Sequence, residues 1–89
     1  MVQYPLETSQ QLSTLLRSLR QSRQLTQAEL GERLGVNQKR IARIESAPGV
    51  TSFDQISRLV ALMGHRLVLE EMPAAEAASA APAQGGASW

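Results

Sequence analysis

The strongest constraint on the fold is one stretch of the chain, residues 26–45, which reads TQAELGERLGVNQKRIARIE. Thr26 is a good helix N-cap, and Glu29 three residues later completes the pattern of a capping box. Gly35 lies where this helix would end, because a left-handed turn is least costly for glycine. Asn37 then begins a second helix. The stretch therefore predicts two short helices that meet at a steep angle across a tight glycine turn.

The apolar residues of this stretch fall on the sides of the two helices that would face inward. They are Leu30, Leu34, Val36, Ile41 and Ile44. Gly31 lies at the expected crossing point, where a larger side chain would push the helices apart. The second helix is thus expected to project from the surface with its polar side outward.

That outward side carries amide and cationic groups, contributed by Gln38, Lys39, Arg40 and Arg43. A glutamine side chain matches the edge of adenine, and arginine or lysine matches guanine. The face therefore has suitable chemistry for reading DNA bases. A solvated basic helix is the alternative interpretation, but the neighbouring glycine turn favours the DNA-reading one.

Charge is divided unevenly along the chain. Residues 1–50 carry seven basic and four acidic side chains, whereas residues 51–89 carry two basic and four acidic ones. The net charge is +3 in the first part and −2 in the second. An anionic partner is therefore expected on the N-terminal side.

A helix is also expected before the central stretch. It begins with Ser9 as its N-cap and runs to about Gln24, and its apolar stripe has helical spacing. The stripe consists of Leu12, Leu15, Leu16 and Leu19. The helix that begins at Asn37 is expected to run to about Ser46, because Pro48 and Gly49 break it.

A last helix is expected between Ser52, its N-cap, and Gly64, its closing glycine. Its inner face would consist of Phe53, Ile56, Leu59, Val60 and Met63. Together with the preceding three, this helix predicts an all-α domain.

The pattern changes after Gly64. His65–Glu71 places three consecutive apolar residues between charged ones and is predicted to form a short strand. A single strand leaves its backbone groups unpaired, and the chain has no second convincing strand. Pairing with the same strand of a second copy is the simplest solution, and an extension of the last helix or a loop is the alternative.

The chain thus divides into four segments: an N-terminal arm (1–8), a helical domain (9–64), a dimerisation strand (65–72) and a tail (73–89). The tail consists mainly of Ala, Pro, Gly, Ser and Gln and is expected to be disordered. It contains Trp89, the only tryptophan. Since this large aromatic side chain has no core to join, a pocket on a partner is its expected destination.

Several classes of function find no support in the sequence. The chain has no cysteine and a single histidine, His65, so we expect neither a metal site nor a disulfide. It has no phosphate-cradling glycine loop and no nucleophile beside a base, so we expect no cofactor and no enzymatic activity. No apolar run approaches the roughly 20 residues that span a bilayer. A cytoplasmic protein without membrane contact is expected, associated with the nucleoid if it binds DNA.

The central stretch resembles the helix-turn-helix motif of the phage-repressor (Cro/C1, XRE) family, and the likeness covers roughly Leu12 to Met63. Both helices of that motif typically begin with glutamine, and Gln27 and Gln38 match this pattern eleven residues apart. The resemblance implies a lambda-repressor-like bundle of four to five short helices. It also implies that the helix beginning near Gln38 enters the major groove of DNA.

The resemblance assigns roles to individual residues as well. Gln38, Lys39 and Arg43 would read bases, whereas Gln27, Asn37 and Arg40 would contact the DNA backbone. Gln27 would also brace Gln38. Arg20 and Glu45 occupy the places of a structural ion pair in this family, so they are not expected to contact DNA.

The whole layout, with its C-terminal strand and its tail ending in tryptophan, resembles HipB-type antitoxins. Those proteins are dimeric repressors that bind an inverted-repeat operator and hold a HipA-type serine/threonine kinase toxin. The resemblance implies a homodimer, and it implies that Trp89 inserts into the toxin. A stand-alone phage-type repressor, or a protein-binding scaffold that reads no DNA, is the alternative.

Overall fold

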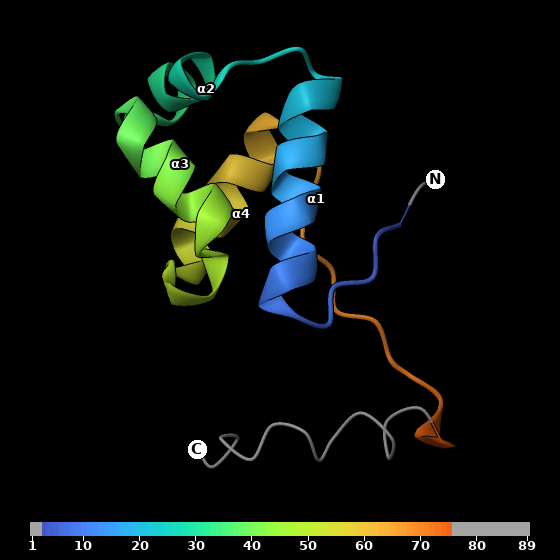
Figure 1. Ribbon diagram of the computed structural model, residues 1–89. Helices are drawn as coiled ribbons and strands as arrows, with labels where there is room; N and C mark the ends of the chain where they lie inside the picture. Colours follow the sequence, from blue (N-terminus) through green and yellow to red (C-terminus); the bar gives the residue numbers. More distant parts are fainter. Residues whose placement is uncertain (1–2, 76–89) are drawn as a thin grey trace.

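The computed structural model describes residues 3–75, and within them it contains four α-helices and one short 3-10 helix. In chain order these are α1 (Ser9–Ser22), α2 (Gln27–Leu34), α3 (Gln38–Ser46), η1 (Pro48–Val50) and α4 (Phe53–Leu62). α1 and α3 lie side by side, α2 lies at the upper end of α3, and α4 lies behind α1 and α3 (Figure 1). The predicted all-α bundle of short helices is confirmed.

The start and the end of α1 differ from the prediction. Thr8 is its N-cap instead of Ser9: the Thr8 hydroxyl accepts from the Gln11 backbone N–H at 3.1 Å, and the Gln11 side chain accepts from the Thr8 backbone N–H. Thr8 and Gln11 have the spacing of a capping box, and this pair extends the helix start by one residue beyond the predicted cap. The helix ends before Gln24, because this residue adopts a positive φ of 57°.

The caps of the next two helices are as predicted. Thr26 and Glu29 form a capping box at the start of α2, and Gly35 ends this helix with a φ of 85°. The hydrogen bond from the Thr26 backbone N–H lowers the pKa of the Glu29 carboxyl, and the Thr26 hydroxyl and nearby Arg33 act in the same direction. The Asn37 side chain accepts from the Arg40 backbone N–H at 2.8 Å and so caps α3.

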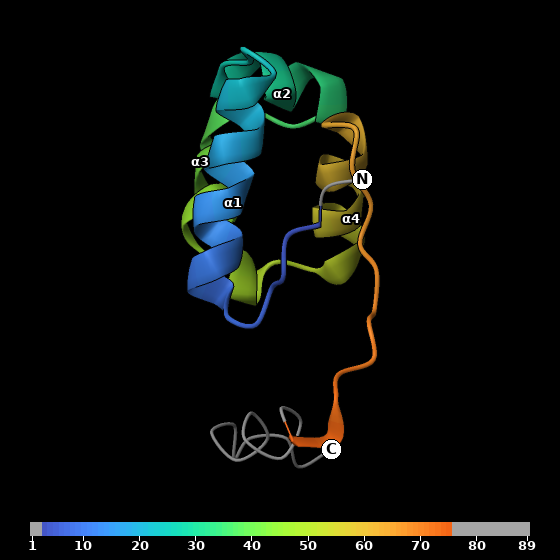
Figure 2. The same ribbon diagram turned by 90° about the vertical axis from the view of Figure 1, so that its right-hand side faces the viewer.

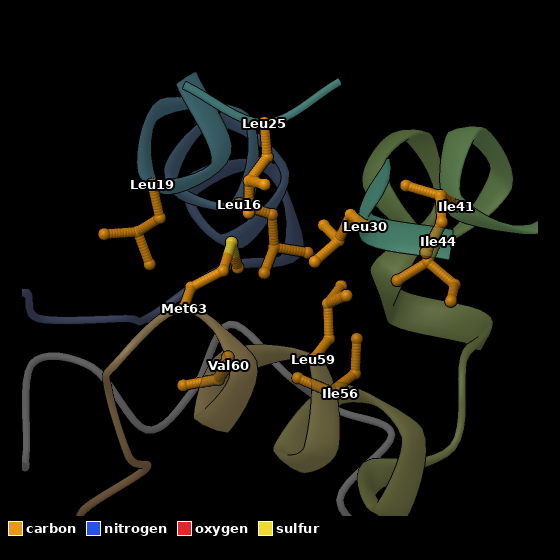
Figure 3. Packing of buried hydrophobic residues seen from close by; sticks show 10 residues of the cluster. All are labelled: Leu16, Leu19, Leu25, Leu30, Ile41, Ile44, Ile56, Leu59, Val60 and Met63. Atoms are coloured by element: carbon orange, nitrogen blue, oxygen red, sulfur yellow. The ribbon is translucent and has the colours of Figure 1, made fainter. Parts of the chain in front are cut away.

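The core lies between α1, α2, α3 and α4 (Figure 3). Its buried apolar side chains are Leu16, Leu19, Leu25, Leu30, Ile41, Ile44, Ile56, Leu59, Val60 and Met63. Leu34 and Val36 are only partly buried. Phe53, predicted to face inward, is 73% exposed, because α4 begins at this residue beyond the edge of the core. Ser52 caps α4, and Gly64 follows with a φ of 79°.

The structure of the single chain does not show the strand predicted at 65–72, and it does not test the predicted pairing with a second copy. No described residue is part of a strand, and this segment runs back alongside α4 and then leaves the helices without regular structure (Figure 2). Leu67 packs against the core, but Val68 and Leu69 are 69% and 96% exposed. The physical reason is that a strand needs the backbone groups of a neighbour, and no other segment within residues 3–75 supplies them.

The N-terminal arm contacts the segment that follows α4. Tyr4 of the N-terminal arm packs beside His65, with 5.9 Å between ring centroids. Most of the predicted tail, including Trp89, lies outside the described residues. No helix within the described residues is long and apolar enough to cross a membrane.

Candidate DNA interface

The turn between α2 and α3 depends on a close approach of backbone to backbone at Gly31. The Gly31 carbonyl accepts hydrogen bonds from the N–H groups of Gly35, at 2.8 Å, and Val36, at 2.9 Å. A Cβ atom at Gly31 would lie 2.7 Å from the Val36 carbonyl oxygen, which is closer than real Cβ contacts allow. Glycine at this position therefore lets α2 approach the backbone of the turn that leads into α3.

A buried ion pair connects the far end of α3 to α1. The Nε of Arg20 lies 2.6 Å from the Oε2 of Glu45, and the two side chains are 13% and 1% exposed. Arg20 also donates from Nη1 to the Leu25 carbonyl at 2.9 Å. The Ser13 hydroxyl donates to the backbone carbonyl of Glu45. α3 is thus fixed to α1 through both the side chain and the backbone of one residue.

A chain of hydrogen bonds connects the Glu45 carboxylate to the surface through two glutamines. Gln27 donates from Nε2 to the Oε1 of Glu45 at 3.1 Å, and Gln38 donates from Nε2 to the Oε1 of Gln27 at 3.5 Å. A carboxylate can only accept, so Glu45 requires Gln27 to turn its NH₂ group inward and its oxygen outward. Gln38 in turn directs its NH₂ group toward Gln27. This leaves the Gln38 oxygen and one of its N–H groups for a ligand.

The outer face of α3 presents the predicted base-reading residues. Gln38, Lys39 and Arg43 are all exposed. Asn37 is exposed too, although its side-chain oxygen is occupied by the N-cap hydrogen bond. Arg40 differs from these residues because it is half-buried and its guanidinium donates to the side-chain oxygen of Gln55 on α4.

Most basic side chains of the described chain have no carboxylate partner. Within the described residues, a carboxylate lies within 4.0 Å of only two basic side chains, Arg20 and Arg58. The others are Arg17, Arg23, Arg33, Lys39, Arg40, Arg43 and Arg66. Three of them, Lys39, Arg40 and Arg43, belong to α3. The surface of this helix therefore attracts an anionic ligand.

A shallow hollow lies beside this face, between the end of α1 and the starts of α2 and α3. Its lining includes Arg20 and the side chains of Gln21, Gln24, Gln27 and Gln38. Amide groups of this kind suit a phosphate, because they supply hydrogen-bond donors. No group of metal-ligating side chains occurs among the described residues.

Two of these contacts were not found by sequence reasoning. Ser13 lies three residues before Leu16 on the apolar stripe of α1, and a polar residue at such a position is a signal for a buried hydrogen bond. Gln55 lies three residues after the cap Ser52, and this position predicts a capping box. Nothing in the sequence indicates that its side chain turns to Arg40 instead.

Residues 11–70 match the family described as the helix-turn-helix domain. The chain belongs to the helix-turn-helix family. No curated protein and no solved structure matches it. Within the motif α2 is the first helix and α3 the second, which in this family of DNA-binding regulators enters the major groove.

Proposed function

We propose that this helix-turn-helix protein is a dimeric, sequence-specific transcriptional repressor that reads the major groove with α3. The observation that carries the proposal is the outer face of α3, where exposed Gln38, Lys39 and Arg43 adjoin a glutamine held by the buried Glu45. The cations on this face have no carboxylate partner among the described residues. Phosphate attraction and base recognition are thus available on the same helix.

The proposed division of labour follows from the chemistry of each side chain. Gln38 has one acceptor and one donor free, which is what the N6 and N7 atoms of adenine require. Lys39 and Arg43 would donate to guanine. The residues proposed to contact the DNA backbone and set the register are Gln27, Asn37 and Arg40.

Dimerisation is the second part of the proposal. The extended segment after α4 leaves Val68 and Leu69 exposed, and Leu62 near the end of α4 is 36% exposed. A second copy that pairs with this segment would cover apolar side chains and satisfy backbone groups at the same time. Two recognition helices related by a two-fold axis would then require an inverted-repeat operator, with half-sites about one helical turn or a multiple apart.

The experiment that tests DNA binding is a titration of the full chain into a fluorescent duplex of mixed sequence at several KCl concentrations. A protein that neutralises phosphates releases counterions, so its affinity is expected to fall steeply as salt rises. Absence of binding at every salt concentration would instead favour the protein-binding scaffold.

We further propose that the partner of this repressor is a HipA-type kinase toxin, with the protein as its antitoxin and the repressor of its own operon. The support is the resemblance in layout and Trp89, which is the only tryptophan and stands among small and polar residues. A kinase-like reading frame beside the gene would supply the partner to test. Removal of residues 86–89 should then weaken binding to that kinase, and an unchanged affinity would contradict the role of Trp89.

A further inference from the structure

Three of the four α-helices begin with the same combination of residues, but one of them uses it differently. A hydroxyl N-cap is followed three residues later by glutamine or glutamate in the pairs Thr8 and Gln11, Thr26 and Glu29, and Ser52 and Gln55. In α1 and α2 the side chain three residues after the cap, Gln11 or Glu29, accepts a hydrogen bond from the backbone N–H of the cap and closes a capping box. In α4 only the Ser52 hydroxyl bond is made, at 3.2 Å, so the Gln55 side chain serves another purpose.

Gln55 reaches to α3. Its Oε1 accepts a hydrogen bond from the Nη2 of Arg40, and both side chains are half-buried. α4 thus forgoes a hydrogen bond at its own N-terminus and makes one to the outer helix of the motif. The residue that it contacts is one that the proposed function assigns to the DNA backbone.

The chemistry of the acceptor suits such a role. Arg40 has no carboxylate within 4.0 Å in the described part of the chain. A glutamate at position 55 would hold the guanidinium equally well, but it would offset the charge that attracts a phosphate. A neutral amide restrains the guanidinium and leaves its charge intact. The guanidinium has five N–H donors, so most of them stay available after the bond to Gln55.

We propose that Gln55 is a positioning residue for DNA binding, which holds the Arg40 guanidinium in place for a phosphate without neutralising it. This inference rests on the proposed function, since it takes duplex DNA as the ligand. It adds a residue of α4, outside the two helices of the motif, to the determinants of affinity.

The test measures the affinity of the full chain for a mixed-sequence 20-base-pair duplex between 50 and 200 mM KCl. We expect Gln55→Glu to make the negative slope of log K against log salt shallower by about 0.9, the value of one phosphate contact, so that the variant loses about threefold less affinity over this range than the wild type. Arg40→Gln should make the slope shallower by a similar amount. Addition of Gln55→Glu to Arg40→Gln should change the slope little further, because the glutamate acts through Arg40.

The matched control is Gln11→Glu, the same substitution at the same position of α1, where the side chain bonds to the cap. Both variants place a negative charge in the first turn of a helix, which favours folding. Equal slopes for Gln55→Glu and Gln11→Glu would overturn the inference, as would full additivity with Arg40→Gln. If the wild type binds no duplex at any salt concentration, the proposed function fails together with the inference. If the wild type binds duplex DNA but the slope for Gln55→Glu equals that for Gln11→Glu, the inference alone fails.

Discussion

Glu45 is the residue through which the core determines the geometry of the candidate interface. Its carboxylate binds Arg20 and Gln27, and its backbone carbonyl accepts from Ser13. The resemblance to phage repressors implied the Arg20–Glu45 pair, and the structure places these side chains 2.6 Å apart. Ser13 and Gln55 could not be assigned from the sequence in the same way, because their partners lie 32 and 15 residues away. Only the packed helices bring such partners together.

At the residue scale we predict that Glu45→Ala lowers the free energy of unfolding by about 3 kcal/mol, because it leaves the largely buried Arg20 without a counter-charge. The matched control is Asp54→Ala. Asp54 pairs with Arg58 at 3.5 Å, but both side chains are more than 70% exposed, so its loss should cost less than about 0.5 kcal/mol. Urea denaturation of both variants measures the change in the free energy of unfolding. Equal decreases would show that the buried pair stabilises the protein no more than the exposed pair does.

The helices were mostly predictable because their ends are specified by local chemistry. Each helix end is determined by residues close to it in sequence, so that a sequence pattern is sufficient to identify it. Examples are the capping box of Thr26 and Glu29, the N-cap Asn37 and the terminating Gly35. The strand predicted at 65–72 is not seen in the single chain, because a strand depends on the backbone groups of a neighbour, which local pattern cannot supply. Phe53 was misplaced for a related reason: helical spacing gives the face of a residue but not where the core ends.

At the element scale we predict that Gly31→Ala destabilises the protein. Alanine is a better helix former than glycine by about 1 kcal/mol. Here, however, its Cβ would lie 2.7 Å from the Val36 carbonyl, and relief of this overlap by backbone movement should cost more, for a net loss of about 1–2 kcal/mol. Thermal denaturation measures the difference, with Glu32→Ala on the exposed side of the same helix as a control within about 0.5 kcal/mol of the wild type. A stabilised Gly31→Ala variant would contradict the close approach of α2 to the turn that leads into α3.

At the scale of the whole molecule, the buried residues fix the position of α3, and the exposed residues of α3 form the candidate interface. The core and the Arg20–Glu45 pair hold this helix, while Gln38, Lys39 and Arg43 remain free on its outer face. Net charge alone, at +1, does not indicate a DNA-binding side. The uneven division of charge along the sequence agrees with the candidate interface, because the seven basic residues of the first 50 include all those of α3.

The central claim is that α3 reads bases and does not merely attract phosphates. The most direct measurement takes duplexes selected by the wild-type protein from a random pool and compares binding of the wild type and Arg43→Ala to each single base-pair variant. We expect Arg43→Ala to lose about 1–3 kcal/mol on the selected site and to lose its preference at one base pair, while preferences elsewhere persist. A loss of the same size on every duplex, with all preferences unchanged, would contradict the claim and reduce Arg43 to a phosphate contact.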